Sequence, residues 1–138
     1  IFASGRVSFL SSAVEAGSDR VVALMNRRYA VADYKRAMDG IHRRFPRIVT
    51  RTQIVIGFPT ETRAEFRETL RLVKELRFDF VEAFMFQSRP MTAAASLEGQ
   101  LGEGEKQRRD IRLLLSLIRL SFRHPRRRLR KRTNTPRG

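Results

Sequence analysis

The sequence predicts an α/β fold in which about three parallel strands are covered by helices. Short runs rich in β-branched and aromatic residues, at positions 6–10, 52–56 and 80–86, have the pattern of strands. The segments between them carry apolar residues at the three- and four-residue spacing of a helix face. Strands that alternate with helices indicate a parallel sheet, and 138 residues make one domain or part of one.

The first third of the chain predicts a short strand and two helices. Residues 6–10 form the strand, and Ser18 is a suitable N-cap for a short helix that runs to about Arg28. A second helix follows and ends before Pro46, because a residue that precedes proline disfavours helical angles. Its apolar face consists of Tyr34, Met38, Ile41 and Phe45.

The central stretch, residues 52–62, combines a buried strand, a tight turn at 57–59 and the start of a helix. Thr62 and Glu65 have the spacing of a capping box, in which hydroxyl and carboxylate satisfy free backbone N–H groups. The apolar stripe of this helix is Phe66, Leu70 and Val73. In such βα units ligands collect at the C-terminal end of the strand, so the turn is the place to expect a site.

The last third predicts a strand, a loop and a long helix. Residues 80–86 are mostly apolar, as expected of a parallel strand covered on both faces. Residues 88–100 have no regular period and predict a loop. Residues 103–122 predict a helix whose buried stripe is Ile111, Leu114, Leu115, Ile118 and Phe122.

Positive charge is concentrated at the end of the chain. The net charge is +15, all 14 acidic residues precede residue 119, and the last 20 residues carry nine Lys or Arg. A disordered tail that neutralises RNA phosphates is one interpretation; it contains no aromatic residue to read bases. An out-of-frame translation of GC-rich DNA is the other, and both remain open. The candidate RNA contacts in the tail are Arg126, Arg127, Arg128, Arg130, Lys131 and Arg132.

Composition argues against several other kinds of site. The sequence has no cysteine, hence no disulfide and no thiolate metal ligand. His42 and His124 have no acidic partners at ligand spacing, so we expect both on the solvated surface and no metal site. No run approaches the length of a membrane span, and no secretory signal is visible at the start.

Four motifs resemble, in order, those of the radical S-adenosylmethionine (SAM) methylthiotransferases. Residues 14–21 (VEAGSDRV) resemble V-Q-S-G-S-D-R-V, and residues 25–29 (MNRRY) resemble M-N-R-x-Y. Residues 55–62 (VIGFPTET) resemble I-V-G-F-P-G-E-T. Residues 88–94 (SRPMTAA) resemble S-P-R-P-G-T-P-A, with one residue fewer before the arginine.

The resemblance implies a partial (βα) barrel of the radical SAM type. A barrel of that type has about six strands, of which residues 1–122 would hold the last three. Residues 123–138 would be the basic, disordered tail. An N-terminal methylthio domain, the first three strands with a three-cysteine loop, and a C-terminal RNA-binding TRAM domain would lie outside this sequence, which would then be a fragment.

The resemblance also implies an activity. The resembled enzymes hold a [4Fe–4S] cluster on three cysteines, bind SAM at its open iron, and insert sulfur and a methyl group at an unactivated C–H bond. Without cysteine this chain lacks the cluster ligands and would be inactive alone. The implied substrate is a tRNA adenosine derivative in the cytoplasm, with a ribosomal protein side chain as the next candidate. A non-catalytic, RNA-associated remnant that binds through its basic surface is the alternative.

The resemblance assigns SAM-pocket roles near the strand ends. Because side chains alternate along a strand, Gln53, Val55 and Gly57 are expected on the barrel interior, and Ile54 and Ile56 against helices. Val55 and Gly57 match positions on the adenine side of the pocket. Gln53 stands where the family commonly has Asp, and an amide hydrogen-bonded within an ordinary core is an equal interpretation.

Three further residues complete the candidate pocket. Glu15 could accept hydrogen bonds from the ribose hydroxyls or amino group of SAM, or pair with Arg20. Ser18 is included, although with Asp19 it is more simply a helix N-terminal residue. Arg89, just after the third strand, could pair with the SAM carboxylate or with a substrate phosphate.

Other departures from the family pattern concern caps and loops. Arg27 and Arg28 suit contacts to an RNA backbone or a solvated helix end. Ala30 stands where the family commonly has a Thr cap, a loss of about 1 kcal/mol. Met91 stands in place of a family Gly, so the loop around it should be shaped differently.

Overall fold

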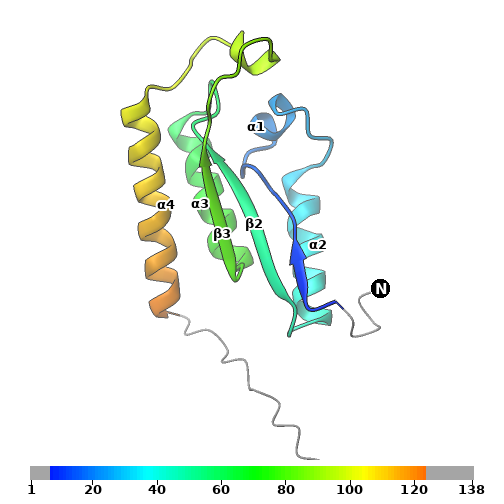
Figure 1. Ribbon diagram of the computed structural model, residues 1–138. Coiled ribbons are helices and arrows are strands. Elements are labelled where there is room, and N and C mark those ends of the chain that lie inside the picture. The colour runs from blue at the N-terminus through cyan, green and yellow to red at the C-terminus, as the bar shows by residue number, and fades with distance from the viewer. Residues whose placement is uncertain (1–6, 124–138) are drawn as a thin grey trace, which may run out of the picture.

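The computed structural model describes residues 7–123, which form a three-stranded parallel sheet in the order β1-β2-β3 (Figure 1). The α/β prediction is confirmed. Residues 1–6 and 124–138, with His124 and the predicted tail contacts, lie outside the described residues. The elements are β1 (Phe9–Ser11), α1 (Asp19–Leu24), α2 (Val31–Arg44), β2 (Val49–Ile56), α3 (Arg63–Leu76), β3 (Phe80–Met85), η2 (Ala93–Ala95) and α4 (Glu103–Arg123).

The central strand β2 separates two environments. Every second residue, from Thr50 to Ile56, is buried, and the residues between them are half-buried on the other face. Ile54 and Ile56 are buried completely, as the predicted alternation requires. The strand begins at Val49, three residues earlier than predicted. The extra segment contains the buried, polar Thr50, whose backbone N–H and hydroxyl both donate to Asp79.

Helices cover one face of the sheet. In Figure 1, α2 and α3 lie behind the strands, α4 lies beside β3, and the face toward the viewer carries no helix in the described part of the chain. Between sheet and helices lies one apolar core. Its members include Val14, Val21, Val22, Met38, Ile54, Ile56, Phe66, Leu72, Val73 and Leu76.

The capping box predicted for α3 is present. The Thr62 hydroxyl accepts the Glu65 N–H at 3.2 Å, and the Glu65 carboxylate accepts the Thr62 N–H at 2.8 Å. The helix ends at Leu76, where Arg77 adopts a left-handed conformation with φ of 50°. Local sequence alone determines this helix start, since both partners lie within one turn.

The first helix has Ser18 at its N-cap position, as predicted, but it ends earlier than predicted. α1 ends at Leu24, four residues before Arg28, and the Ser18 side chain makes no cap hydrogen bond. Asp19 instead accepts the N–H of Val31, the first residue of α2, at 2.6 Å. Asp19 therefore replaces part of the capping that Ala30 cannot supply.

The strand β3 is less covered than predicted. It is an edge strand of the described sheet, with Phe80 and Phe84 each 49% exposed and Met85 40% exposed. The prediction of cover on both faces is wrong for the described residues. The apolar sequence of the strand could not reveal this. It shows only that burial of these side chains would be favourable, and not whether another segment packs against them.

Four of the five residues in the predicted buried stripe of α4 face outward; the Phe122 side chain lies outside the described part of the structure. Ile111, Leu114, Leu115 and Ile118 are between 42% and 55% exposed. The face packed on the core instead carries Lys106, Arg109 and Leu113, at 5%, 5% and 1%. A lysine and an arginine on one helix face predict that this face is exposed to solvent. Their burial is possible because partners elsewhere in the chain offset the cost of removing the charges from water.

His42 is also less solvated than predicted. Its Nε2 lies 3.3 Å from the Thr50 hydroxyl, and its ring contacts Phe78 edge-on. Among the described residues, no group of His, Cys, Asp and Glu could hold a metal ion. None of the described helices combines the length and apolar character needed to cross a membrane.

Candidate ligand site at the ends of the strands

An open hollow of about 330 Å³ lies at the C-terminal ends of the strands. Its size falls at the lower end of the range for small-molecule sites. Most of its walls are apolar, with a carboxylate and a guanidinium among them. The lining residues are Glu15, Leu24, Met25, Asn26, Arg27, Val55, Phe58, Phe86, Ala93 and Ala94.

Glu15 reaches the hollow because its backbone continues the sheet beyond β1. Its N–H donates to the Gln53 carbonyl at 3.0 Å, and its own carbonyl accepts the Val55 N–H at 2.8 Å. The residue has φ of 63°, a left-handed conformation unusual for glutamate. Its carboxylate accepts a hydrogen bond from Arg27, not from Arg20 as one interpretation had it. A carboxylate and a cation thus share one rim of the hollow.

Two aromatic rings form another wall. Phe58 and Phe86 meet edge to face, with ring centroids 5.2 Å apart. Phe58 belongs to the turn after β2, and Phe86 directly follows β3 and donates its N–H to the Ile56 carbonyl at 2.8 Å. Val55, half-buried on the open face of β2, lies beside them. These surfaces suit the flat face of a heterocycle.

Arg20 ties two motifs together behind the hollow. Its guanidinium bonds both carboxylate oxygens of Glu65, at 2.7 and 2.8 Å, and also the Thr60 carbonyl. Thr60 has φ of 68° and stands where the resembled motif has a glycine. For a residue with a Cβ that conformation costs about 1 kcal/mol. The Arg20 contact holds the strained turn in place.

Glu65 should make stability depend on pH. The hydrogen bond from Arg20 lowers the pKa of Glu65 to about 2, from 4.5 in the unfolded chain. A carboxyl group whose pKa is lower in the folded state stabilises the fold at pH values above its unfolded pKa. This contribution is lost as pH falls from about 5 toward 2. We expect Glu65→Gln to cost about 1 kcal/mol at pH 7, because Arg20 is half exposed and water screens the pair. In urea titrations at several pH values the difference should vanish near pH 2; parallel pH curves would contradict the assignment.

Comparisons with known proteins agree with the motifs. No family model matches the chain. A tRNA-2-methylthio-N(6)-dimethylallyladenosine synthase from Pectobacterium atrosepticum is 39% identical over 103 residues, covering 75% of this chain and 22% of that protein. The protein of the same name from Aquifex aeolicus is 40% identical over 100 residues, covering 72% and 23%. Over about three quarters of its length, the chain is thus similar to tRNA methylthiotransferases. It spans between a fifth and a quarter of the length of these relatives.

The fold is shared with a radical SAM enzyme. Coproporphyrinogen III oxidase from Escherichia coli, described as a radical SAM enzyme, superposes with a TM-score of 0.74 at 20% identity. The match covers 87% of this chain and 28% of that one. The expected partial (βα) barrel of the radical SAM type is therefore confirmed.

The structure brings only some of the predicted pocket residues together. Glu15 and Val55 line the hollow, and so does Arg27, which was considered for RNA contact. Arg28 lies exposed beyond the end of α1. Gln53 lies on the open face lower in β2, where its amide donates to Glu82 at 3.3 Å.

Three other predicted residues lie apart from the hollow. The Ser18 hydroxyl donates to Glu65 on the helix side. Arg89 lies in the exposed loop after β3, where its carbonyl accepts from Thr92. The placement predicted for Gly57 is wrong: it lies past the end of β2 with φ of 73°, and a Cβ added there would meet the Lys106 side chain from α4. Side chains alternate between the two faces of the sheet only while the backbone is extended, and at Gly57 it no longer is.

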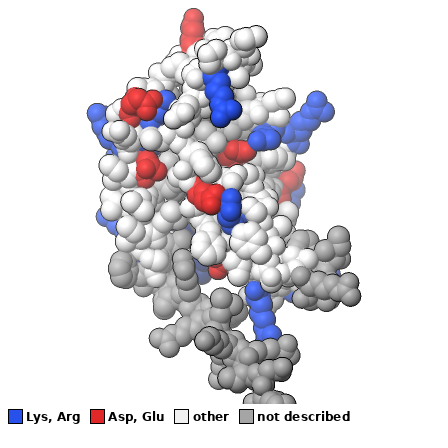
Figure 2. All heavy atoms as spheres, viewed as in Figure 1, with Lys and Arg blue, Asp and Glu red and all other residues white. Residues whose placement is uncertain are grey.

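The charges around the open face do not form a single basic patch. In Figure 2, which shows this face, acidic and basic side chains are interspersed, and a large area carries neither. On the strands, Arg51 pairs with Glu82 at 2.8 Å. The described part of the chain thus gives RNA no continuous basic surface on the face in view.

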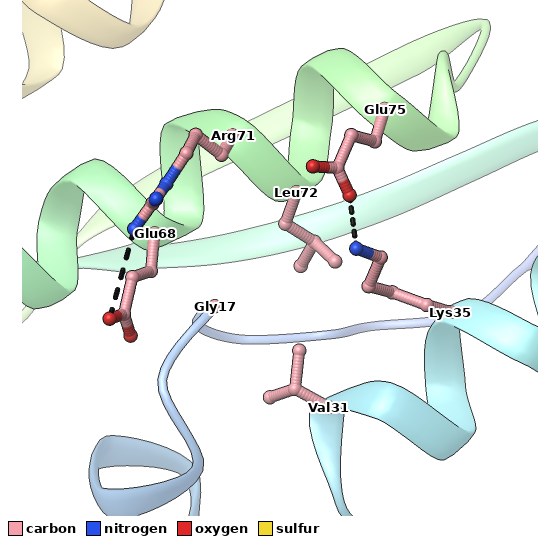
Figure 3. Close-up of a pocket in the computed structure, with 7 residues that line it drawn as sticks. All are labelled: Gly17, Val31, Lys35, Glu68, Arg71, Leu72 and Glu75. Atoms are coloured by element: carbon pink, nitrogen blue, oxygen red, sulfur yellow. Dashed lines mark ion pairs between the residues drawn. The ribbon is translucent and has the colours of Figure 1, made fainter.

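A second hollow, of about 260 Å³, lies on the helix side between α2 and α3 (Figure 3). Its floor is formed by Gly17, Val31 and Leu72, and ion pairs flank it, Lys35 with Glu75 and Arg71 with Glu68. The charged groups of this second hollow pair with one another, so fewer of them are available to contact a ligand than in the first hollow.

Proposed function

We propose that this chain supplies part of the SAM site of a methylthiotransferase, and that the hollow at the strand ends holds the adenosine portion. The observation that carries the proposal is the lining of the hollow: apolar and aromatic walls beside one carboxylate at the C-terminal ends of parallel strands. The similarity to tRNA methylthiotransferases supports the same ligand.

Each group has a role in this proposal. Val55, Phe58 and Phe86 pack against the faces of the adenine. The Glu15 carboxylate accepts hydrogen bonds from the ribose hydroxyls, and its partner Arg27 holds it in this orientation. The apolar walls exclude water from that contact, which strengthens it.

The residues fit SAM but not the iron–sulfur cluster. SAM bound at such a cluster supplies a carbon radical that abstracts hydrogen from the substrate. The cluster needs thiolate ligands, and this sequence has no cysteine. The ligands must therefore come from residues outside this sequence, and the role of the present residues is to bind and orient the nucleoside.

We further propose that the whole protein modifies an adenosine derivative in tRNA, as the names of its relatives suggest, and that it does so in the cytoplasm. Residues 1–122 would supply the C-terminal half of the barrel, and 123–138 an RNA-binding arm. A non-catalytic RNA-associated protein is the second candidate, favoured by the nine Lys or Arg in the last 20 residues. A ribosomal protein is the alternative substrate.

Titration of the chain with SAM by calorimetry tests the first proposal. Glu15→Gln keeps the shape of the side chain but removes the charge, so affinity should fall about tenfold. Glu75→Gln is the matched control: Glu75 also pairs with a cation, Lys35, but lies on α3 away from the hollow. Equal affinities of both variants, or no SAM binding by the wild type, would contradict the proposal.

A further inference from the structure

Lys106 on α4 is a buried cation outside the lining of the hollow. It is 5% exposed, although lysine is seldom buried without a buried partner charge. Within residues 7–123, the one carboxylate that forms an ion pair with it, Glu103, has a side chain that is 71% exposed. Burial of the ammonium therefore requires another reason.

The contacts of Lys106 join the ends of two strands. Its Nζ donates to the Phe86 carbonyl at 2.8 Å, and the same atom lies 5.9 Å from the centroid of the Phe86 ring. Its methylene stem covers Gly57, where an added Cβ would come within 2.6 Å of the Lys106 Cγ. Gly57 directly follows β2, and Phe86 directly follows β3.

These two residues lead into the aromatic wall of the hollow. Phe58 follows Gly57 in the chain, and its ring meets that of Phe86. The Lys106 side chain thus packs on the turn that carries the Phe58 ring, and it donates a hydrogen bond to the backbone that carries the Phe86 ring. An apolar residue of similar length would fill the same space but leave the Phe86 carbonyl without this donor.

We propose that Lys106 is a positioning residue for the ligand site: it fixes the Phe58–Phe86 wall from behind. This inference rests on the proposed SAM site and adds a residue of α4 to it. An alternative is that Lys106 only attaches α4 to the body of the protein. The two differ because attachment changes stability alone, whereas positioning changes ligand affinity in a protein that remains folded.

Lys106→Met separates these roles, because it keeps the stem over Gly57 and removes the ammonium. Calorimetric titration of the full chain with SAM should show affinity reduced about tenfold, with the melting temperature within a few degrees of wild type. Lys74→Met is the control: it makes the same change on an exposed position of α3 and should leave affinity unchanged. Wild-type affinity in Lys106→Met, or failure of this variant to fold, would overturn the inference.

A ligand-free measurement keeps this test separate from the SAM proposal. In NMR spectra of the apo chain, Lys106→Met should shift the Phe86 carbonyl carbon and weaken the nuclear Overhauser contacts between the Phe58 and Phe86 rings. If wild type does not bind SAM, the proposed function fails, and the ring contacts still decide the role of Lys106. Unchanged contacts in the variant would overturn it.

Discussion

Gly17→Ala should destabilise the protein by about 3 kcal/mol or more, enough to unfold much of the chain under native conditions. A Cβ at Gly17 would lie 2.5 Å from the Thr69 backbone nitrogen and 2.6 Å from the carbonyl carbon of Glu68. Those atoms belong to α3, so no flexible side chain can move aside. Figure 3 shows the chain at Gly17 passing close to this helix. The Gly17 N–H, which donates to the Thr69 hydroxyl at 2.8 Å, would lose its partner as well.

Gly40→Ala is the matched control. Gly40 lies inside α2, and nothing lies within 4 Å of a Cβ added there. Because alanine favours a helix interior over glycine, this substitution should stabilise the protein by about 0.5–1 kcal/mol. Urea unfolding followed by circular dichroism measures both variants. Similar effects of the two substitutions would show that α3 does not approach the backbone at Gly17 as closely as described.

Features determined within one turn of chain were predictable from the sequence. The α3 capping box and the alternation along β2 both depend on near neighbours only, and both are present. The face of α4 was not predictable, since the helix has two candidate faces. The more apolar one carries Ile111 and Leu115, yet partners from distant segments for Lys106 and Arg109 select the other.

The candidate site was predictable in part for the same reason. Motif position and strand alternation placed Val55 and Glu15 near the strand ends. The aromatic wall was missed, although Phe58 stood inside the quoted turn, because the pairing with Phe86 joins residues 28 positions apart. Glu61 was also visible in its motif, but its burial depends on α4.

Arg109→Gln should be the most costly substitution on α4, destabilising the protein by about 3–5 kcal/mol at pH 7. Arg109 Nη1 donates to Glu61 at 2.6 Å, and the two side chains are 6% and 1% exposed. The Gly57 N–H donates to the same carboxylate oxygen at 3.2 Å, while the other oxygen has no hydrogen-bond partner among residues 7–123. Loss of the guanidinium would leave the buried Glu61 carboxylate with the Gly57 N–H as its neutral hydrogen-bond donor. Arg108→Gln, on the exposed side of the same turn, should cost less than about 1 kcal/mol.

The cost of Arg109→Gln should also depend on pH. Burial raises the pKa of Glu61 above 4.5, against the opposing effect of Arg109, and removal of Arg109 raises it further. A group with a raised folded pKa loses its stabilising contribution as pH rises through that folded pKa. Since the pKa of Glu61 is higher in the variant, the variant loses stability relative to wild type as pH rises beyond the wild-type folded pKa, which itself lies above 4.5. In the double variant with Glu61→Gln neither member of this pair is charged, so at least half of the neutral-pH loss should be recovered. Urea titrations at pH 4.5 and pH 7 measure all three variants. A loss in Arg109→Gln that is equal at both pH values, or no larger than in Arg108→Gln, would show that the Glu61 carboxylate does not depend on Arg109.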